Sequence, residues 1–272
     1  MRNRRWTLAR KLVQLSILVL FLSPLFGLKV IRGTLGMSQV FGVFLADPLA
    51  VLEAALAAKT VYLPVIYAAL LVLGFYFIVG GRAYCSWVCP VNLLLEGVAW
   101  VRERLKIGRD LVFQGNPRYK LLGGVLILSL LSGLPVYEIV SPVAVLMRDI
   151  LFGWGTEILI VLAVVLLDLF ISRRGWCRYL CPLGAFYSLI GRFSLLRVKF
   201  QPSKCTNCAR CDEVCYVGPH LTRQLRSGGE TLIASGDCSN CGACIDACKE
   251  GALSLGLRGS AGAVTSGQAS RG

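Results

Sequence analysis

The stretch CTNCARCDEVC at residues 205–215 and the stretch CSNCGACIDAC at residues 238–248 share one cysteine spacing, C-x2-C-x2-C-x3-C. The thiols of these two runs belong to Cys205, Cys208, Cys211 and Cys215, and to Cys238, Cys241, Cys244 and Cys248. The other four of the twelve cysteines form two C-x3-C-P motifs, at Cys85 and Cys89-Pro90 and at Cys177 and Cys181-Pro182. No cysteine is left over, so every thiol of the chain stands in a repeated motif.

The doubled run predicts two [4Fe–4S] clusters. Such a cluster needs four thiolates around a small cube, and a loop with a cysteine at every third residue wraps three corners. In bacterial two-cluster ferredoxins the fourth cysteine of each run binds the other cluster. This rule assigns one cluster to Cys205, Cys208, Cys211 and Cys248, and the other to Cys238, Cys241, Cys244 and Cys215. Structural zinc is the alternative, but zinc sites use C-x2-C pairs rather than a doubled run of four.

Both runs depart from the ferredoxin pattern at one position. The last cysteine is usually followed by proline, whereas Tyr216 and Lys249 stand there in this chain. Proline is not a ligand, so we still expect both clusters, with the charge of Lys249 shifting the potential of one. His220 is the only histidine, which excludes bis-His haem ligation within this chain. We interpret His220 as an ordinary residue in the loop after Cys215.

The rest of the chain is more apolar than a soluble globular protein. Of 272 residues 56% are hydrophobic and 16% are charged, and the mean hydropathy is +0.66. Four apolar segments, 12–31, 61–80, 120–140 and 155–172, each come close to the ~20 residues that a bilayer core requires. We therefore expect an α-helical polytopic membrane protein with four transmembrane helices and a small α+β ferredoxin-like domain. The first segment is expected to be retained as a helix, not cleaved as a signal peptide.

The net charge of +14 fits this interpretation. Lys and Arg gather at the N-terminus, in 82–120 and in 173–204, and cytoplasmic loops carry such an excess. The expected location is a bacterial inner membrane, with both termini and all the cysteine motifs on the cytoplasmic side. A basic chain could also bind nucleic acid, but no nucleic-acid-binding motif is present, so we expect no such partner.

The apolar part contains an internal repeat. Asp47-Pro48-Leu49 resembles Ser141-Pro142-Val143, and in both copies an apolar segment and a C-x3-C-P motif follow. Such a repeat predicts two units of the same topology, at about 12–110 and 120–200. The expected domains are thus the membrane domain at 1–200, the ferredoxin-like domain at 201–257 and a disordered tail at 258–272.

The C-x3-C-P cysteines are a second candidate site. Residues at i and i+4 share one face of a helix, and the repeat could bring Cys85, Cys89, Cys177 and Cys181 together. A third iron–sulfur centre, a dithiol pair, a structural metal and simple burial of the thiols stay open at this point. The aromatic residues around them could form either an interfacial belt or a quinone-binding surface: Tyr84, Trp87, Trp176 and Tyr179.

Asp168 is the candidate proton acceptor. It lies inside the fourth apolar segment, where a carboxylate is a functional hypothesis by default. The alternative is an ion pair with Arg173 at the end of that segment.

The stretches YCSWVCPVNL at 84–93 and WCRYLCPLGAFYS at 176–188 resemble those of the NapH-type ferredoxin-like membrane subunits associated with periplasmic nitrate reductase systems. The wider group includes the ferredoxin-like proteins of methylamine utilisation and the membrane part of nitrous-oxide regulator-like proteins. The resemblance covers nearly the whole chain. It implies a quinol dehydrogenase component of anaerobic respiration. Electrons would pass from menaquinol or ubiquinol to a periplasmic iron–sulfur partner resembling NapG, or to a cytochrome, and then to a terminal reductase.

Two other functions compete with quinol oxidation. One is a redox-sensing factor, or a maturation factor that reductively activates a periplasmic metalloenzyme. The other is a scaffold in which the clusters only stabilise the fold.

Overall fold

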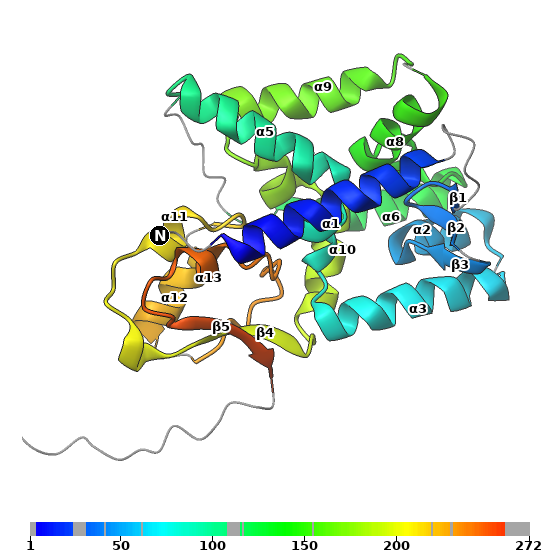
Figure 1. Cartoon of the computed structure of the whole chain (residues 1–272). Helices are drawn as coiled ribbons and strands as arrows, with labels where there is room; N and C mark the ends of the chain where they lie inside the picture. The colour runs from blue at the N-terminus through cyan, green and yellow to red at the C-terminus, as the bar shows by residue number, and fades with distance from the viewer. Residues whose placement is uncertain are drawn as a thin grey trace, which may run out of the picture.

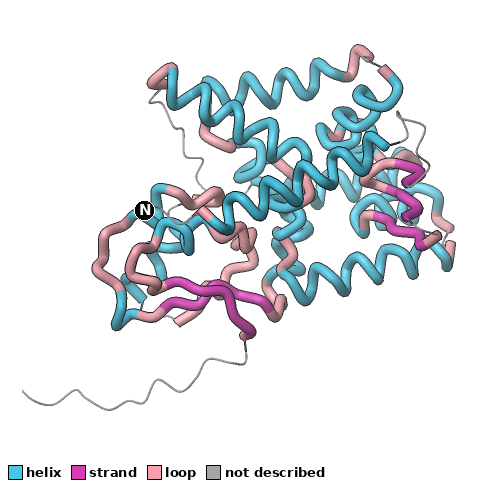
Figure 2. The backbone as a smooth tube through the Cα atoms, viewed as in Figure 1, coloured by secondary structure: helices cyan, strands magenta, loops and turns pink. Residues whose placement is uncertain are grey.

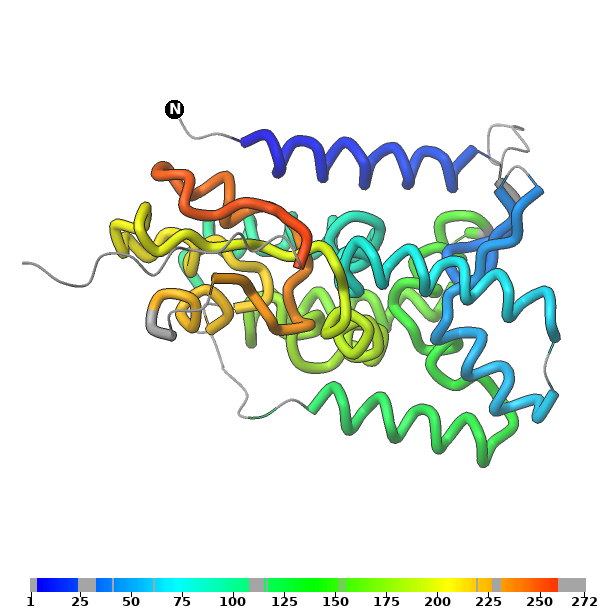
Figure 3. Tube along the Cα trace, turned by 90° about the horizontal axis from the view of Figure 1, so that it is seen from below, coloured from blue at the N-terminus to red at the C-terminus, as the bar shows by residue number. Residues whose placement is uncertain are grey.

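The computed structural model describes residues 4–23, 31–40, 42–60, 62–107, 115, 117–153, 155–218, 220–228 and 231–258. Figure 1 shows a larger helical region and a smaller region around two strands, with helix α1 (Arg5–Leu22) extending from one to the other. Along its length, which Figure 3 shows from below, α1 contacts α4 (Ala83–Trp87) and α5 (Pro90–Arg104) of the helical region and α13 (Ala243–Ala247) of the smaller region.

The helical region contains the same series of elements twice. The first unit has α2 (Pro48–Ala58), α3 (Leu63–Val79), α4 (Ala83–Trp87) and α5 (Pro90–Arg104). The second unit has α8 (Pro142–Phe152), α9 (Ile158–Leu166) with the π-helix η2 (Leu167–Ile171), η3 (Trp176–Leu180) and α10 (Pro182–Gly191). Proline starts α2, α5, α8 and α10, a position where its missing N–H costs nothing. The C-x3-C-P motif therefore places its second cysteine directly before a helix in both units.

Shorter elements connect and cover these units. α6 (Pro117–Ser132) packs against α2 and α10, and α7 (Val136–Val140) follows it. A small antiparallel sheet precedes α2 and packs on α3; it consists of β1 (Ile31–Gly33), β2 (Met37–Val40) and β3 (Val43–Ala46). The core between the helices is dense, with Leu49, Leu95 and Tyr187 at most 1% exposed.

The smaller region is α+β. β4 (Leu196–Phe200) pairs antiparallel with β5 (Leu253–Leu257), from Leu196 opposite Leu257 to Phe200 opposite Leu253, and Figure 2 shows the two strands along one edge. Between them lie η4 (Pro202–Lys204), α11 (Arg210–Glu213), α12 (His220–Gly228) and α13 (Ala243–Ala247). His220 begins α12 instead of lying in a loop. The expected domain boundary near residue 201 stays a prediction, and the expected tail lies outside the described residues apart from Arg258.

The structure contradicts the expected four-helix membrane protein. Within the described ranges, no helix is both long and apolar enough to cross a membrane. α1 has 18 residues but includes Arg5, Arg10 and Lys11, and α3 has 17 residues. α6 ends at Ser132, and α9 has 9 residues before the backbone becomes the π-helix η2. At 1.5 Å per residue, 17 residues span about 26 Å, less than the ~30 Å of a bilayer core.

The same finding contradicts the expected location in an inner membrane with cytoplasmic termini, because that assignment depended on the four spans. The hydropathy of a window does not register where a helix ends. Gly80, with φ 120°, ends α3, and Gly133, with φ 70°, follows α6; both conformations favour glycine. Large apolar side chains on these helices remain exposed, among them Leu15, Leu71, Phe75, Leu131 and Leu159.

Candidate iron–sulfur sites

The two cysteine runs of the smaller region have the same local backbone. Asn207 and Ala209 in the first run have positive φ, as do Asn240 and Gly242 at the same positions of the second. Residues in this conformation turn the chain so that successive N–H groups face one side. The Asn207 N–H accordingly donates to Cys205 Sγ at 3.4 Å. Each run thus forms a loop that turns backbone donors toward its own sulfurs.

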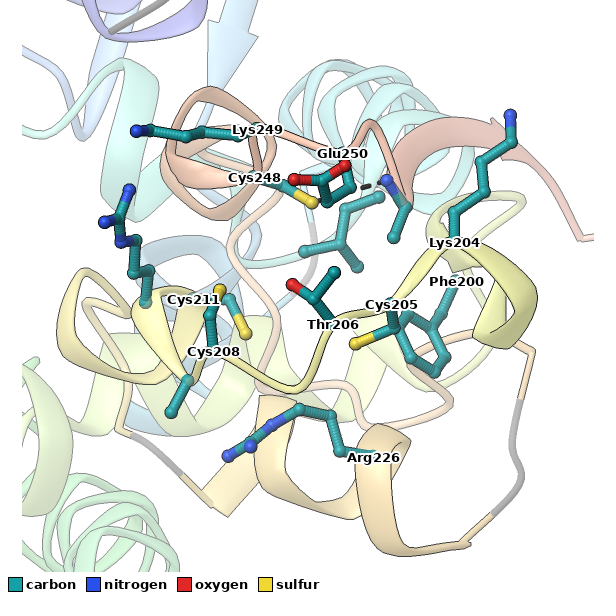
Figure 4. Close-up of a pocket in the computed structure, with 14 residues that line it drawn as sticks. Phe200, Lys204, Cys205, Thr206, Cys208, Cys211, Arg226, Cys248, Lys249 and Glu250 are labelled. Atoms are coloured by element: carbon teal, nitrogen blue, oxygen red, sulfur yellow. Dashed lines mark hydrogen bonds between the residues drawn. The ribbon is translucent and has the colours of Figure 1, made fainter.

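The first candidate cluster site is a surface cavity of about 170 Å³. Figure 4 shows sulfur atoms of both runs facing this space; they belong to Cys205, Cys208, Cys211 and Cys248. Cationic side chains also line it, including Arg226 and Lys249. The N–H of Arg210 lowers the pKa of the exposed Cys208 thiol. The structure therefore brings together the four cysteines of the first expected set.

The second candidate set is more deeply placed. Burial raises the pKa of Cys244, and the charges of Cys241, Cys238, Cys215 and Cys211 raise it further, so Cys244 lies near cysteines of both runs. The pKa of Cys238 is raised to about 12, first by burial, against a backbone N–H bond from Asn240. Cys215, which comes from the first run, thus lies among the cysteines of the second.

The C-x3-C-P cysteines meet in the core of the helical region. Cys85 lies on α4 and Cys177 on η3, while Cys89 and Cys181 directly precede α5 and α10. Burial raises the pKa of Cys177 far above its usual value, and the charges of the other three cysteines add to this. Cys181 Sγ accepts from the Gly184 N–H at 3.4 Å and lies 3.7 Å from the Tyr137 hydroxyl. Motifs 92 residues apart in the chain therefore form one thiol site.

Two buried arginines face this thiol site. Arg82 is 3% exposed, donates to the Cys177 carbonyl at 2.9 Å and lies near Cys85. Burial raises the pKa of Cys85 to about 11, and the charges of Arg82 and Arg118 partly oppose this. Nε of both arginines has no hydrogen-bond partner among the described residues. Four thiolates in an apolar core need such cations, so the donor set fits an anionic iron–sulfur group.

Across the part of the chain that the structure describes, no three His, Cys, Asp or Glu side chains are arranged to hold a single metal ion. In a [4Fe–4S] cube each thiolate binds its own iron, so its ligands stand further apart than those of one zinc ion.

The loop at 238–241, which carries cysteines of the second candidate set, contacts α4, the helix that carries Cys85. Ser86 Oγ, on the helix that carries Cys85, donates to the Ser239 carbonyl at 2.7 Å. Trp87 Nε1 donates to the Asn240 carbonyl at 3.2 Å. The ligand loop of the second set therefore lies directly on α4. The sequence predicted both motifs but held no signal for this contact between residues 153 positions apart.

Glycines permit this close approach. A Cβ at Gly236 would lie 2.1 Å from the Ser188 carbonyl oxygen, and one at Gly81 would lie 1.9 Å from that of Tyr187. Next to this junction, Asp237 accepts hydrogen bonds from Ser188 and from Arg118, the latter at 2.5 Å, and lies 3.8 Å from Arg82. Asp237 was not singled out in the sequence, although it directly precedes Cys238.

Asp168 is buried, at 2% exposed. Its Oδ1 accepts from the Trp176 N–H at 3.1 Å, whereas Oδ2 has no partner within the described ranges. Burial raises the pKa of Asp168 to about 6, against the Trp176 N–H and the charge of Arg174. Arg173, its expected partner in the alternative interpretation, forms an ion pair with Glu103 at 2.9 Å.

Two of the aromatic residues near the C-x3-C-P motifs, Tyr84 and Trp87, pack against other rings. Tyr84 is buried and stacks on Tyr187 with ring centroids 5.0 Å apart. Trp87 meets Trp6 edge to face at 6.4 Å. These contacts occupy the Tyr84 and Trp87 rings within the protein.

Comparison with known families defines the class of this protein. A family described as "4Fe-4S binding domain" matches residues 62–108 and 154–202, which contain the two C-x3-C-P motifs. A second family, "4Fe-4S dicluster domain", matches residues 197–249. The chain is an iron–sulfur protein.

Relatives along the full chain show the particular family. The methylamine utilization ferredoxin-type protein MauN of Methylorubrum extorquens is 42% identical over 95% of this chain and 91% of its own length. MauN of Paracoccus denitrificans is 43% identical over 86% and 84%. The ferredoxin-type protein NapH of Haemophilus influenzae is 39% identical over 93% and 90%.

The chain belongs to the family of NapH and MauN ferredoxin-type proteins, which confirms the resemblance to NapH. It is an electron-transfer iron–sulfur protein. No solved structure matches it.

Proposed function

We propose that this protein oxidises a hydroquinone and passes the electrons through three iron–sulfur centres to a partner iron–sulfur protein or cytochrome, which supplies a terminal reductase. The observation that carries the proposal is the contact of the 238–241 loop with α4, the helix of Cys85. Electron transfer depends on how closely the fold positions the redox groups. This contact joins the thiol site of the helical region to the second cysteine set.

We assign the ligands by position. Cys205, Cys208, Cys211 and Cys248 would hold one [4Fe–4S] cluster, and Cys238, Cys241, Cys244 and Cys215 the second. Cys85, Cys89, Cys177 and Cys181 would hold a third centre. When bound, these groups supply one-electron carriers. The chain provides the thiolates and, through Arg82 and Arg118, positive charge in the core.

The fold offers a candidate hydroquinone site between α5 and the loop after Cys215. A cavity of about 450 Å³ there is lined by Leu93 and Trp100 and by several charged or polar side chains, among them Glu96, Arg174 and Tyr216. Its volume falls in the range of small-molecule sites. Tyr216 directly follows Cys215, so a ligand in this cavity would lie next to the second cysteine set.

Residues around the cavity are fixed in place. Glu96 accepts from Arg10 at 3.0 Å, and the Arg174 guanidinium lies 3.8 Å from the centre of the Tyr216 ring. The Tyr216 hydroxyl lies 3.4 Å from Glu96 Oε1, so these two groups would together bind one hydroxyl of a hydroquinone. Asp168 is the proposed acceptor for a released proton, because it is buried and one of its oxygens has no partner among the described residues.

The test begins with anaerobic purification, iron and sulfide counts, and EPR after addition of a menaquinol analogue. About twelve irons would support three cubes, and about eight would leave only the two sites of the smaller region. Cys181→Ser should remove the third centre, whereas Ser132→Ala, at an exposed helix end, should not. Loaded clusters that no hydroquinone reduces would overturn quinol oxidation and favour the redox-sensing or maturation function.

A further inference from the structure

A cluster of three carboxylates lies beside the thiol site of the helical region. Asp47 directly precedes α2, and its Oδ1 accepts from the Leu49 N–H at 3.2 Å. Glu53, in the same helix, is 0% exposed, and its Oε2 accepts from the Glu138 N–H at 3.3 Å. Glu53 Oε1 has no hydrogen-bond partner among the described residues. We call Asp47, Glu53 and Glu138 the carboxylate cluster.

Gly36 allows the cluster to form. Its carbonyl accepts from the Asp47 N–H at 2.8 Å. A Cβ at this position would lie 2.6 Å from Glu138 Oε1. Gly36 therefore binds the backbone of Asp47 and, because it has no Cβ, leaves room for the Glu138 carboxylate.

Tyrosines fill the space between the cluster and the cysteines. The Tyr187 hydroxyl donates to Asp47 Oδ1 at 3.2 Å. Its ring stacks on Tyr84, the residue before Cys85, and meets Tyr76 at 5.1 Å. On the other side, Tyr137 precedes Glu138 in the chain, and its hydroxyl lies 3.7 Å from Cys181 Sγ. Tyrosine side chains therefore connect the thiol site with the carboxylate cluster in two places, through Tyr84 and Tyr187 and through Tyr137.

The cluster is poised to exchange a proton near neutral pH. Burial raises the pKa of Asp47 to about 7, against the Leu49 N–H, and the charge of Glu138 raises it further. Burial likewise raises the pKa of Glu53 to about 7. The cation that faces the cluster is Arg148, which opposes the effect of burial on Glu138. The hydroxyls that face it belong to Tyr76, Tyr84, Tyr137 and Tyr187.

Resting on the proposed function, in which the four C-x3-C-P cysteines hold a redox centre, we propose that the carboxylate cluster takes up one proton when that centre is reduced. Reduction adds a negative charge in a region of low dielectric, which disfavours ionised carboxylates nearby. One electron enters from the reductant, a hydroquinone in the proposed function and dithionite in the test. One proton enters from water, one O–H bond forms on a cluster oxygen, and reoxidation reverses both changes.

The proposal fixes the pH dependence of the reduction potential. Below about pH 7 the cluster is protonated in both redox states, so the potential is constant. Above that pH, up to the higher pKa of the reduced state, reduction becomes tenfold less favourable per pH unit, which equals 59 mV for one electron. At still higher pH neither state is protonated, and the potential is constant again.

The experiment is a potentiometric EPR titration of this centre at several pH values, with infrared difference spectra of dithionite-reduced minus oxidised protein. Wild type should show the pH-dependent region and gain a carboxylic-acid C=O band on reduction. Asp47→Asn keeps an acceptor for Leu49 and should flatten the potential and remove or shift the band. Glu53→Gln should act in the same way. Tyr187→Phe removes a donor that lowers the pKa of Asp47, so it should move the pH-dependent region to higher pH. Asp149→Asn, a buried carboxylate of α8 outside the cluster, should leave both unchanged.

A centre whose potential is constant across this range, with no carboxylic-acid band on reduction, would overturn the coupling and leave the proposed electron transfer intact. Loss of the band in Asp149→Asn but not in Asp47→Asn or Glu53→Gln would also overturn it. Absence of any redox signal sensitive to Cys181→Ser would overturn this proposal together with the third centre. If Asp47→Asn fails to fold, Glu53→Gln and Tyr187→Phe decide the outcome.

Discussion

The cysteines of the helical region and those of the smaller region have very different surroundings. Cys89 and Cys181 are 8% and 9% exposed and lie at helix starts, among large apolar side chains. In the smaller region Cys211 lies on α11 and Cys244 on α13, the other cysteines lie in the loops beside these short helices, and Cys208 is exposed. The proposed ligands thus lie in a packed helix core in one region, and in loops and short helices in the other.

This difference indicates what each site contributes to folding. In the helical region, Cys89 and Cys181 belong to a core that consists mainly of other apolar side chains, such as Leu49, Leu95 and Tyr187. In the smaller region the cysteines themselves pack against the core of Val198, Leu225 and Leu253. We expect bound clusters to stabilise the smaller region strongly and to matter less for the fold of the helical region.

The largest effect should come from ligand substitutions in the two regions. Cys205→Ser and Cys89→Ser should each remove about four of about twelve irons. Cys205→Ser should also leave residues 197–257 sensitive to limited proteolysis, because the cluster links loops with little other support. Cys89→Ser should keep the protease resistance of wild type. Equal protease sensitivity in the two variants would contradict the difference in folding role.

The next largest effect is a loss of folding stability from a substitution where the two regions meet. Asp237→Asn leaves Arg82 and Arg118, at 3% and 2% exposed, without their shared counter-charge. Loss of one partner from a buried ion pair costs about 3–5 kcal/mol, measurable as the free energy of unfolding in denaturant. Glu157→Gln is the control, because its exposed pair with Arg148 should contribute less than about 1 kcal/mol. Similar losses in both variants would show that Asp237 does not join the regions.

Protonation of Asp237 at low pH should cause part of the same loss of stability. Burial would raise the pKa of Asp237, but Arg82, Arg118 and the Ser188 hydroxyl outweigh it and hold the pKa below its ordinary value of 3.8. The stability contributed by this carboxylate is present above that value and is lost as the pH falls through the lower, folded-state pKa. Unfolding measured from pH 5 to pH 2 should therefore decline less steeply in Asp237→Asn than in wild type. If stability declined equally steeply with falling pH in both proteins, the stabilising role of the Asp237 carboxylate would be contradicted.

The backbone contact between the regions gives an intermediate effect. Gly236→Ala places a Cβ 2.1 Å from the Ser188 carbonyl oxygen, and such overpacking costs about 1–3 kcal/mol. Gly124→Ala in α6 should instead be neutral or stabilise by up to about 1 kcal/mol, because its Cβ meets no heavy atom of the described residues within 4 Å. Thermal unfolding of both variants checks this, and equal melting temperatures would contradict the close approach.

The smallest effect compares the two loops of the smaller region. Ala209 and Gly242 occupy matching left-handed positions, with φ 58° and 71°. Ala209→Gly should stabilise by about 0.5 kcal/mol, because relief of the left-handed strain exceeds the added chain entropy. Gly242→Ala should destabilise by at least about 1 kcal/mol, since its Cβ would also lie 2.5 Å from the Trp6 side chain. Opposite signs in denaturant unfolding confirm the shared backbone; equal signs contradict it.

Much of the site chemistry was predictable because it depends on local spacing. Ligand loops need cysteines a few residues apart, so the doubled run indicated iron–sulfur chemistry without a structure. The stretches at 84–93 and 176–188 likewise indicated the family. The two cysteines of each C-x3-C-P motif were expected on one face of a helix, but the second cysteine instead directly precedes α5 or α10, because proline begins these helices. Hydropathy failed for the spans because it reports composition over a window, whereas Gly80 and the π-helix η2 set helix length.

The sequence by itself thus determined which residues could bind iron and sulfide, because motif spacing is a property of the local chain. Only the tertiary structure decided that Ser86 meets Ser239, that Asp237 lies between two buried arginines, and that Tyr187 reaches Asp47. Those pairs are separated by more than 110 residues in the chain. Their contacts follow from how the helices pack and from glycines that let backbones approach, and neither leaves a local pattern in the sequence.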